Sequence, residues 1–209
     1  MSALLEVRVA AKHFPANRSV REILRGDRPV VKAVDGVDFD LNPGETLGIV
    51  GESGCGKTTL GRMLLRLIKP SDGAIRFDGV DIVDLKGPPL LDFRRRAQLV
   101  FQNPFDALNP RFTIGEAVAE PLRNTGVPEA EHDDRVARAM RRVRLQDVEA
   151  YLEKYPHQLS GGQLQRVVLA RALVLEPDFI VADEPVSMLD VSVRAGILNV
   201  MRDIGEQMG

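Results

Sequence analysis

A glycine-rich segment from Gly51 to Thr58 carries residue types that bind phosphate. It reads G-E-S-G-C-G-K-T and matches the pattern G-x-x-x-x-G-K-[ST] in full. Glycines at these positions let successive backbone N–H groups turn towards a nucleotide, the Lys57 ammonium can reach the β- and γ-phosphates, and the Thr58 hydroxyl can ligate Mg²⁺. The segment predicts a nucleotide site, and the alternative is a glycine turn that binds nothing.

The residues around this loop predict the elements that would position it. The apolar run from Leu47 to Val50 is typical of a buried parallel strand. Apolar residues then recur at helical spacing after the loop: Leu60, Met63, Leu64, Leu67 and Ile68. A helix that starts at the loop adds its partial positive charge to an anion site. We therefore expect the order strand, loop, helix.

A second glycine-rich segment, L-S-G-G-Q, occupies residues 159–163. Ser160 and Gln163 fit the S-x-x-Q capping box, and a helix is predicted by the apolar residues that follow: Val167, Val168, Leu169, Ala172 and Leu173. Capping alone does not explain Gly161 and Gly162, because each glycine in a first turn costs up to about 1 kcal/mol against alanine. Close approach of the backbone to a phosphate would explain them.

Two carboxylates, Asp183 and Glu184, follow the apolar run at 179–182. Open α/β sheets place ligand chemistry at the carboxyl ends of their strands. The alternative is an acidic strand end or helix cap before Pro185. Gln102 similarly follows an apolar run at 99–101, and its amide could contact Mg²⁺ or belong to an ordinary loop before Asn-Pro.

Along the chain the motifs follow one another as the phosphate loop, Gln102, L-S-G-G-Q, Asp183-Glu184 and S-M-L-D at 187–190. This order resembles that of the nucleotide-binding subunit of ABC transporters, and the resemblance covers nearly all 209 residues. The segments V-K-A-V-D-G-V at 31–37, F-Q-N-P-F-D-A-L-N-P at 101–110 and Y-P-H-Q-L-S-G-G-Q are similar to the dipeptide, oligopeptide and nickel importer branch. The resemblance implies an α/β fold: a RecA-like P-loop NTPase core with an N-terminal antiparallel β-subdomain and an inserted α-helical subdomain. The core would comprise 1–102 and 159–209, and the insert 103–158.

The resemblance also implies residue roles. Lys57, Gln102 and Glu184 would be catalytic, with Glu184 polarising the attacking water, and Thr58, Gln102 and Asp183 would hold Mg²⁺. The residues expected to bind ATP are Phe14, Gly51, Glu52, Ser53, Gly54, Cys55, Gly56, Lys57, Thr58, Thr59, Gln102, Ser160, Gly161, Gly162, Gln163 and Asp190. Phe14 would stack on adenine, although packing within a strand is an alternative. We expect a bulky thiol reagent on Cys55 to block nucleotide binding.

By the same resemblance, two chains would form a head-to-tail dimer with two composite sites. Ser160, Gly161 and Gly162 would contact the γ-phosphate held by the other chain, and Asp190 would line the junction. The partners implied are a second ABC ATPase subunit, identical or different, integral membrane permease subunits reached through the Gln102 loop, and indirectly a solute-binding protein. The function implied is ATP-driven import of peptides or a similar small solute at the cytoplasmic face of the membrane.

Two other functions remain open at this point. A soluble ABC ATPase could remodel a protein or ribosomal complex, and a chain without turnover could be a nucleotide-binding module. The second arises because the family continues to a strand whose histidine contacts the γ-phosphate, whereas no histidine follows Asp190. We therefore expect a C-terminally truncated chain with weak turnover.

Composition limits the remaining classes. The chain is 44% hydrophobic and 28% charged with a net charge of −2, which is typical of a globular protein without the basic footprint of a nucleic-acid binder. One cysteine permits no internal disulfide, no apolar run reaches membrane-spanning length, and His13 and His157 lack metal-ligand spacing. Any membrane link would come through a partner.

The rest of the chain predicts further elements. Alternation predicts edge strands at 4–9 and 33–41, separated by a loop at 16–29, and a hairpin turn at Asp78-Gly79 after residues 75–77. One helix should bury Val136, Ala139, Met140 and Val143; its Arg135, Arg138, Arg141, Arg142 and Arg144 are interpreted as a solvated face, with a docking surface as the alternative. A last helix should bury Val193, Ile197, Val200, Met201 and Ile204.

Overall fold

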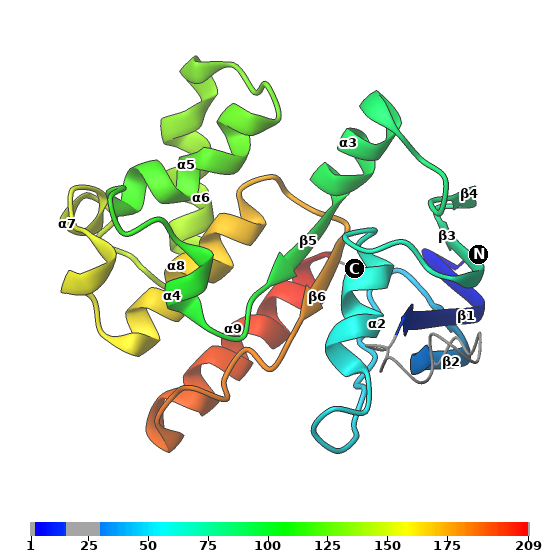
Figure 1. Ribbon diagram of the computed structural model, residues 1–209. Coiled ribbons are helices and arrows are strands. Elements are labelled where there is room, and N and C mark those ends of the chain that lie inside the picture. Colours follow the sequence, from blue (N-terminus) through cyan, green and yellow to red (C-terminus); the bar gives the residue numbers. More distant parts are fainter. Residues whose placement is uncertain (1–2, 16–29, 209) are drawn as a thin grey trace, which may run out of the picture. The chain divides into compact units, whose positions relative to one another are not determined.

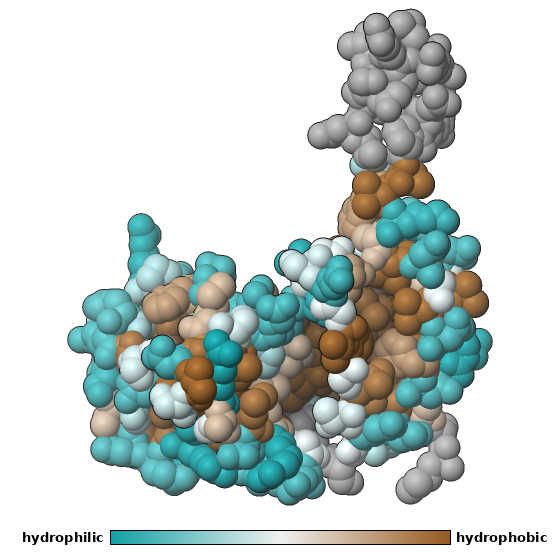
Figure 2. Space-filling model, turned by 90° about the horizontal axis from the view of Figure 1, so that it is seen from below, coloured by the Kyte–Doolittle hydropathy of each residue, from teal (hydrophilic) through white to brown (hydrophobic). Residues whose placement is uncertain are grey.

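The computed structural model describes residues 3–15 and 30–208, so the loop predicted at 16–29 lies outside the described residues. The chain divides into two compact units, one ending at Lys86 and the other beginning at Gly87. The face drawn in Figure 2 mixes apolar and hydrophilic residues. Exposed large apolar side chains occur in both units; examples are Val31, Val80, Phe105 and Val191.

The first unit contains an antiparallel sheet in the order β2-β1-β3-β4, which includes the two strands that the alternation predicted (Figure 1). Its strands are β1 (Leu5–Pro15), β2 (Val30–Leu41), β3 (Asp72–Phe77) and β4 (Val80–Asp81). Leu5, Val7 and Ile75 are fully buried on one face. The predicted turn joins β3 to β4 through Asp78 and Gly79, both with positive φ, which suits a tight hairpin.

A β-bulge interrupts the pairing of β1 with β2. Lys12 pairs with Val34, and the next residue, His13, pairs with Lys32, which leaves Ala33 as the extra residue. The Ala33 carbonyl lies so close to Gly56 that a Cβ built on this glycine would be 2.0 Å from the oxygen. Bulges often re-aim a strand next to a functional site. Here the bulge lets β2 meet the phosphate loop.

The helix after the phosphate loop, α2 (Lys57–Leu64), is shorter than predicted. Leu67 and Ile68 lie beyond it, because Arg66 takes a left-handed conformation with φ 53° and closes the helix. The N–H groups of Arg66 and Leu67 bond to the carbonyls of Met63 and Arg62, which is the Schellman pattern. Arg66 also donates from Nε to the carbonyl oxygens of Ile82 and Val83, so contacts distant in sequence help to end the helix.

The strand predicted from Leu47 to Val50 is wrong in this structure. These residues form neither helix nor strand, and Val50 is 96% exposed. An apolar run becomes a parallel strand only when neighbours satisfy its backbone on both sides. In the described part of the chain, the parallel sheet consists of β5 and β6.

The second unit is built around β5 (Ala97–Val100) and β6 (Phe179–Ala182), which pair in parallel. The helix α3 (Gly87–Arg96) leads into β5. The strand at 179–182 was predicted from its apolar run, whereas the pairing with β5 was not. The long helices that follow are α5 (Ile114–Asn124), α6 (His132–Arg142), α8 (Gly161–Leu173) and α9 (Val191–Met208). Shorter elements connect them: α4 (Pro104–Ala107), η1 (Glu129–Glu131), α7 (Glu149–Leu152) and η2 (Pro156–Gln158).

The core of the second unit joins the faces predicted from periodicity. Val136, Ala139, Met140 and Val143 are buried at and just after α6, and Ile197, Val200 and Ile204 are buried on α9. Among the arginines of α6, Arg138 is more than half exposed, and Arg135 pairs with Glu131. A solvated face and a docking surface both fit this exposure, so the interpretation stays a prediction. The predicted boundaries of a helical insert at 103–158 stay a prediction.

Candidate functional site

The phosphate loop has the backbone conformation that its glycines allow. Gly54 and Gly56 have φ of 82° and 100°, values at which other residues are strained. Lys57 is the first residue of α2, so Thr58 and Thr59 lie in its first turn, at the end of the helix that carries a partial positive charge. Glu52, Ser53 and Gly54 are exposed before this turn. The loop therefore presents a helix start to solvent, as a phosphate site requires.

The Lys57 ammonium lies inside the loop. Its Nζ donates to the carbonyl oxygens of Gly51 at 2.7 Å and Glu52 at 2.8 Å. The Cys55 Sγ lies 3.9 Å from the same Nζ and would be 2.6 Å from a Cβ built on Gly51. The loop thus closes on its own cation, and the exposed thiol lies beside it. The cation, the helix start and the Thr58 hydroxyl suit the phosphates of a magnesium nucleotide.

Phe14 belongs to β1 and is 38% exposed, so the structure does not bury it as an ordinary core residue. The Lys12 Nζ lies 5.2 Å from its ring centroid, within the range of a cation–π contact. The bulge at Ala33, which touches Gly56, lies opposite the step from Lys12 to His13. Phe14 is therefore close in the sheet to the strand position that contacts the phosphate loop.

Gln102 and the two carboxylates come together in the second unit, at the carboxyl ends of β5 and β6. Gln102 Nε2 donates to Glu184 Oε2 at 2.9 Å, although 82 residues separate them in sequence. The Asp183 N–H donates to the Val100 carbonyl at 3.1 Å, which continues the pairing of the two strands. Parallel pairing thus confirms the expected place of these residues at one sheet edge.

Glu184 has a strained backbone. Its φ is 47°, and Pro185 follows it. A non-glycine residue with positive φ costs of order 1–3 kcal/mol and persists when its surroundings hold it. The turn after it supplies such contacts, since the Ser187 N–H and Oγ both donate to the Glu184 carbonyl, at 3.1 and 3.0 Å. The residue with this strained backbone is also the one whose carboxylate accepts the hydrogen bond from Gln102.

The L-S-G-G-Q segment starts α8 with a complete capping box. The Gln163 N–H donates to Ser160 Oγ at 3.3 Å, and the Ser160 N–H donates to Gln163 Oε1 at 3.0 Å. A Cβ on Gly162 would lie 2.5 Å from Val193 Cγ1 of α9, whereas one on Gly161 would make an ordinary 3.5 Å contact with Leu189. Packing against α9 is thus a second reason for Gly162, one that the sequence did not reveal.

Asp190 lies just before α9, and its carbonyl accepts from the N–H groups of Val193 and Arg194. Arg194 also donates from Nε to the Leu189 carbonyl at 2.8 Å. The exposed Asp190 side chain is therefore held at the start of a helix by its backbone. The phosphate-loop residues and Phe14 belong to the first unit; Gln102, the carboxylates, the signature residues and Asp190 belong to the second.

Sequence analysis missed three features beside these residues. Ala33 carries the bulge, Lys12 covers the Phe14 ring, and Val193 makes Gly162 necessary. The contact between Lys12 and the Phe14 ring could have been predicted, because residues two apart in a strand lie on the same face. The other two depend on pairing register and on helix packing, which no local pattern specifies.

Comparison with known proteins gives the family. The model of the ABC transporter family matches residues 34–187. The oligopeptide transport ATP-binding protein AppF of Bacillus subtilis is 46% identical over 98% of this chain and 61% of its own length. The dipeptide transport ATP-binding protein DppF of Escherichia coli is 44% identical over 99% of this chain and 60% of its own length. The chain thus spans about three fifths of the length of these relatives.

Solved structures agree on the fold. The ATP-binding cassette MJ0796, solved as a dimer in a post-hydrolysis state with ADP and Pi, has a TM-score of 0.81 at 29% identity, over 98% of this chain and 84% of that one. CbiO1 of Clostridium perfringens, part of the CbiONQ transporter complex, has a TM-score of 0.79 at 28% identity, over all of this chain and 76% of that one. The fold is that of ABC ATPase cassettes, and the chain belongs to the ABC transporter family.

Proposed function

We propose that this chain binds and hydrolyses ATP as the energy-supplying subunit of an ABC importer for peptides or a similar small solute. The observation that carries the proposal is the closed phosphate loop, in which Lys57 lies at the start of α2. The names of AppF and DppF, which state oligopeptide and dipeptide transport, support the substrate class. No relative quoted above is named as a remodelling ATPase, so that alternative gains no support.

At the phosphate loop, Lys57 would exchange the carbonyls of Gly51 and Glu52 for phosphate oxygens. The exchange replaces neutral acceptors by charged ones, which form stronger hydrogen bonds with an ammonium. Backbone N–H groups from Gly54 to Thr59 would take the remaining oxygens, and Phe14 would stack on adenine.

In the second unit, Gln102 and Glu184 would act on the water that attacks the γ-phosphate. Their hydrogen bond at 2.9 Å keeps the amide and the carboxylate within reach of one water molecule. Thr58, Asp183 and Gln102 would hold Mg²⁺, which neutralises charge on the β- and γ-phosphates. Glu184 would accept the proton of the water, and Gln102 would orient it.

A complete site would need a second chain. Ser160 and Gly161 are exposed at the start of α8, where they could meet phosphates bound by another subunit, and Asp190 is exposed before α9. MJ0796 was solved as a dimer and CbiO1 is part of a larger transporter complex, which supports a dimer that works with permease subunits and, through them, a solute-binding protein. Residues 103–158 would form the helical subdomain, and the permease would be reached through the Gln102 loop.

We propose a peripheral position on the cytoplasmic face of the membrane. None of the helices in residues 3–15 and 30–208 has the length and apolarity needed to cross a bilayer. In this proposal the permease subunits attach the chain to the membrane.

Calorimetric titration with Mg-ATP tests the proposal, with Lys57→Ala as the matched variant. We expect saturable binding that the substitution weakens at least tenfold, since it removes a charged hydrogen bond. Glu184→Gln should bind ATP like the unsubstituted chain and hydrolyse it far more slowly. A folded chain that binds no ATP, or binds it equally after Lys57→Ala, would overturn the proposed site.

A further inference from the structure

The Phe14 end of β1 extends past β3, although it stays paired with β2. Pairing with β3 stops at Ala11 and Asp72, whereas pairing with β2 continues to Pro15. From Lys12 onward one edge of β1 therefore has no strand beside it among the described residues. A strand edge of this kind needs other partners for its backbone groups.

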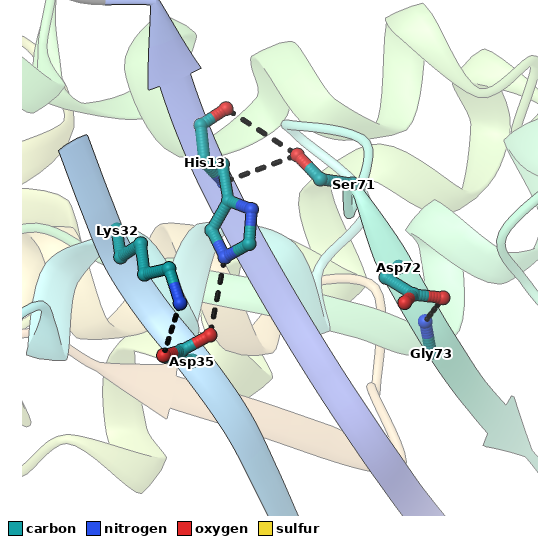
Figure 3. A network of polar contacts seen from close by, with 6 residues as sticks. All are labelled: His13, Lys32, Asp35, Ser71, Asp72 and Gly73. Atoms are coloured by element: carbon teal, nitrogen blue, oxygen red, sulfur yellow. Dashed lines mark hydrogen bonds and ion pairs between the residues drawn. The ribbon is translucent and has the colours of Figure 1, made fainter. Parts of the chain in front are cut away.

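Ser71 supplies those partners. Its N–H donates to the Ala11 carbonyl at 2.8 Å, and its Oγ accepts the His13 N–H at 3.0 Å and donates to the His13 carbonyl at 3.3 Å. Figure 3 shows this hydroxyl against the backbone of His13. One side chain thus extends the ladder to the residue before Phe14.

Lys12 is held from the same segment. Its Nζ donates to the Lys69 carbonyl at 2.7 Å and lies over the Phe14 ring at 5.2 Å. With one side of the ring facing this cation, the opposite side is the one that could take a base. On its other side, β1 contacts β2 through His13, whose Nε2 lies 3.2 Å from Asp35 Oδ1 (Figure 3). Lys32, also on β2, contacts the second oxygen of this carboxylate at 3.1 Å.

We propose that Ser71, with the Lys69 carbonyl, positions Phe14 for adenine recognition and so connects the adenine face to the phosphate loop. Ser71 and Lys69 belong to the segment that leaves α2, whose first residue is Lys57. A single short stretch of chain therefore fixes both ends of the nucleotide site. The inference rests on the proposed ATP binding and adds positioning residues that do not touch the nucleotide.

The test compares two probes on the 209-residue chain, Mg-ATP and magnesium tripolyphosphate, which lacks adenine. Ser71→Ala should weaken ATP binding about fivefold, the scale of one or two hydrogen bonds, and change tripolyphosphate binding by less than about twofold. Ser71→Thr keeps the hydroxyl and should restore ATP affinity. Lys12→Met, which keeps the side-chain stem and removes the cation, should act in the same direction as Ser71→Ala.

Each outcome decides something. If Ser71→Ala weakened the binding of ATP and of tripolyphosphate equally, the substitution would have loosened the site in general. If the ATP affinity did not change, Ser71 would not position Phe14. Either result would overturn the inference without affecting the proposal that the unsubstituted chain binds ATP. Unchanged ATP affinity in Phe14→Ala would overturn it as well, since adenine would then lie elsewhere. Absence of ATP binding in the unsubstituted, folded chain would remove both this inference and the proposed function. Thermal unfolding of every variant separates these results from a failure to fold.

Discussion

The phosphate loop and the acidic end of β6 reach their geometry in different ways. The loop binds its own cation: Lys57 bonds to carbonyls five and six residues before it. The carboxylate Glu184 depends instead on Gln102, 82 residues earlier, and on a strained backbone. A motif that closes on itself can be recognised from a few adjacent letters, whereas one assembled across strands needs the fold.

The largest effect should come from the one place where the loop itself depends on distant structure. Gly56→Ala would put a Cβ 2.0 Å from the Ala33 carbonyl at a φ of 100°. Strain and overpacking together should cost about 2–5 kcal/mol of unfolding free energy, measured in urea. Gly54 has a φ of 82° and open space around its Cα, so Gly54→Ala should cost only about 1–2 kcal/mol. Equal costs for the two would show that the Ala33 bulge does not constrain the loop.

The second effect concerns the glycines at the start of α8. Gly162→Ala should cost about 1–3 kcal/mol, because its Cβ would be 2.5 Å from Val193 Cγ1 and valine has little rotamer freedom in a helix. Gly161→Ala should be neutral or stabilising by up to about 1 kcal/mol, since only an ordinary contact is made. Urea unfolding measures the free energy of unfolding of the two single variants. The same measurement is made on the double variant that combines Gly162→Ala with Val193→Ala.

Recovery of stability in the double variant would confirm that α9 selects Gly162. If Gly162→Ala were as stable as Gly161→Ala, the glycine would have to be explained by ligand contact alone. This prediction therefore separates a packing role from a binding role at one residue of the signature.

These cases show what the sequence could and could not predict. The capping box at Ser160 and the strand at 179–182 were correct, because short local patterns determine them. The strand at 47–50 was wrong, because strand formation depends on partners that composition does not reveal. The predicted end of α2 was also wrong. The residue in the left-handed position is Arg66 rather than a glycine, and the carbonyls of residues 82 and 83 hold its side chain.

Among the site residues, the types and order were readable, but their contacts were not. The Gln102–Glu184 hydrogen bond follows from the parallel pairing of β5 with β6. The surroundings of Phe14 follow from a bulge and a strand edge. Both sets of contacts depend on the pairing register of the strands, and a one-residue shift of that register would abolish them.

A third, smaller effect tests the strain at Glu184. Glu184→Gly and Glu184→Ala both remove the carboxylate and its bond to Gln102, but glycine tolerates a φ of 47°. After the entropy that glycine gains in the unfolded chain is subtracted, the glycine variant should be more stable by about 0.5–1 kcal/mol. Denaturant midpoints of the pair give the difference. Equal stability would mean that the turn relaxes when the carboxylate is lost, and that Gln102 imposes the strain.

The smallest effect should come from the exposed edge of the first unit. The hydrogen bond from Arg8, whose Nη1 is 2.6 Å from Asp40 Oδ1, lowers the pKa of that carboxyl below its ordinary 3.8. The folded state therefore binds fewer protons than the unfolded state in acid, so the contribution of the pair is present above the ordinary pKa and is lost as the pH falls through the lowered value.

Asp40→Asn should accordingly reduce stability slightly near neutral pH, and the difference from the unsubstituted chain should disappear in acid. Urea unfolding between about pH 2.5 and pH 6 measures this, and about 1 M salt should reduce the difference because solvent screens an exposed pair. A difference that persisted in acid and in salt would mean that Asp40 supports the β1–β2 pairing by packing rather than by charge. Contacts other than the Arg8–Asp40 ion pair would then hold this edge of the first unit.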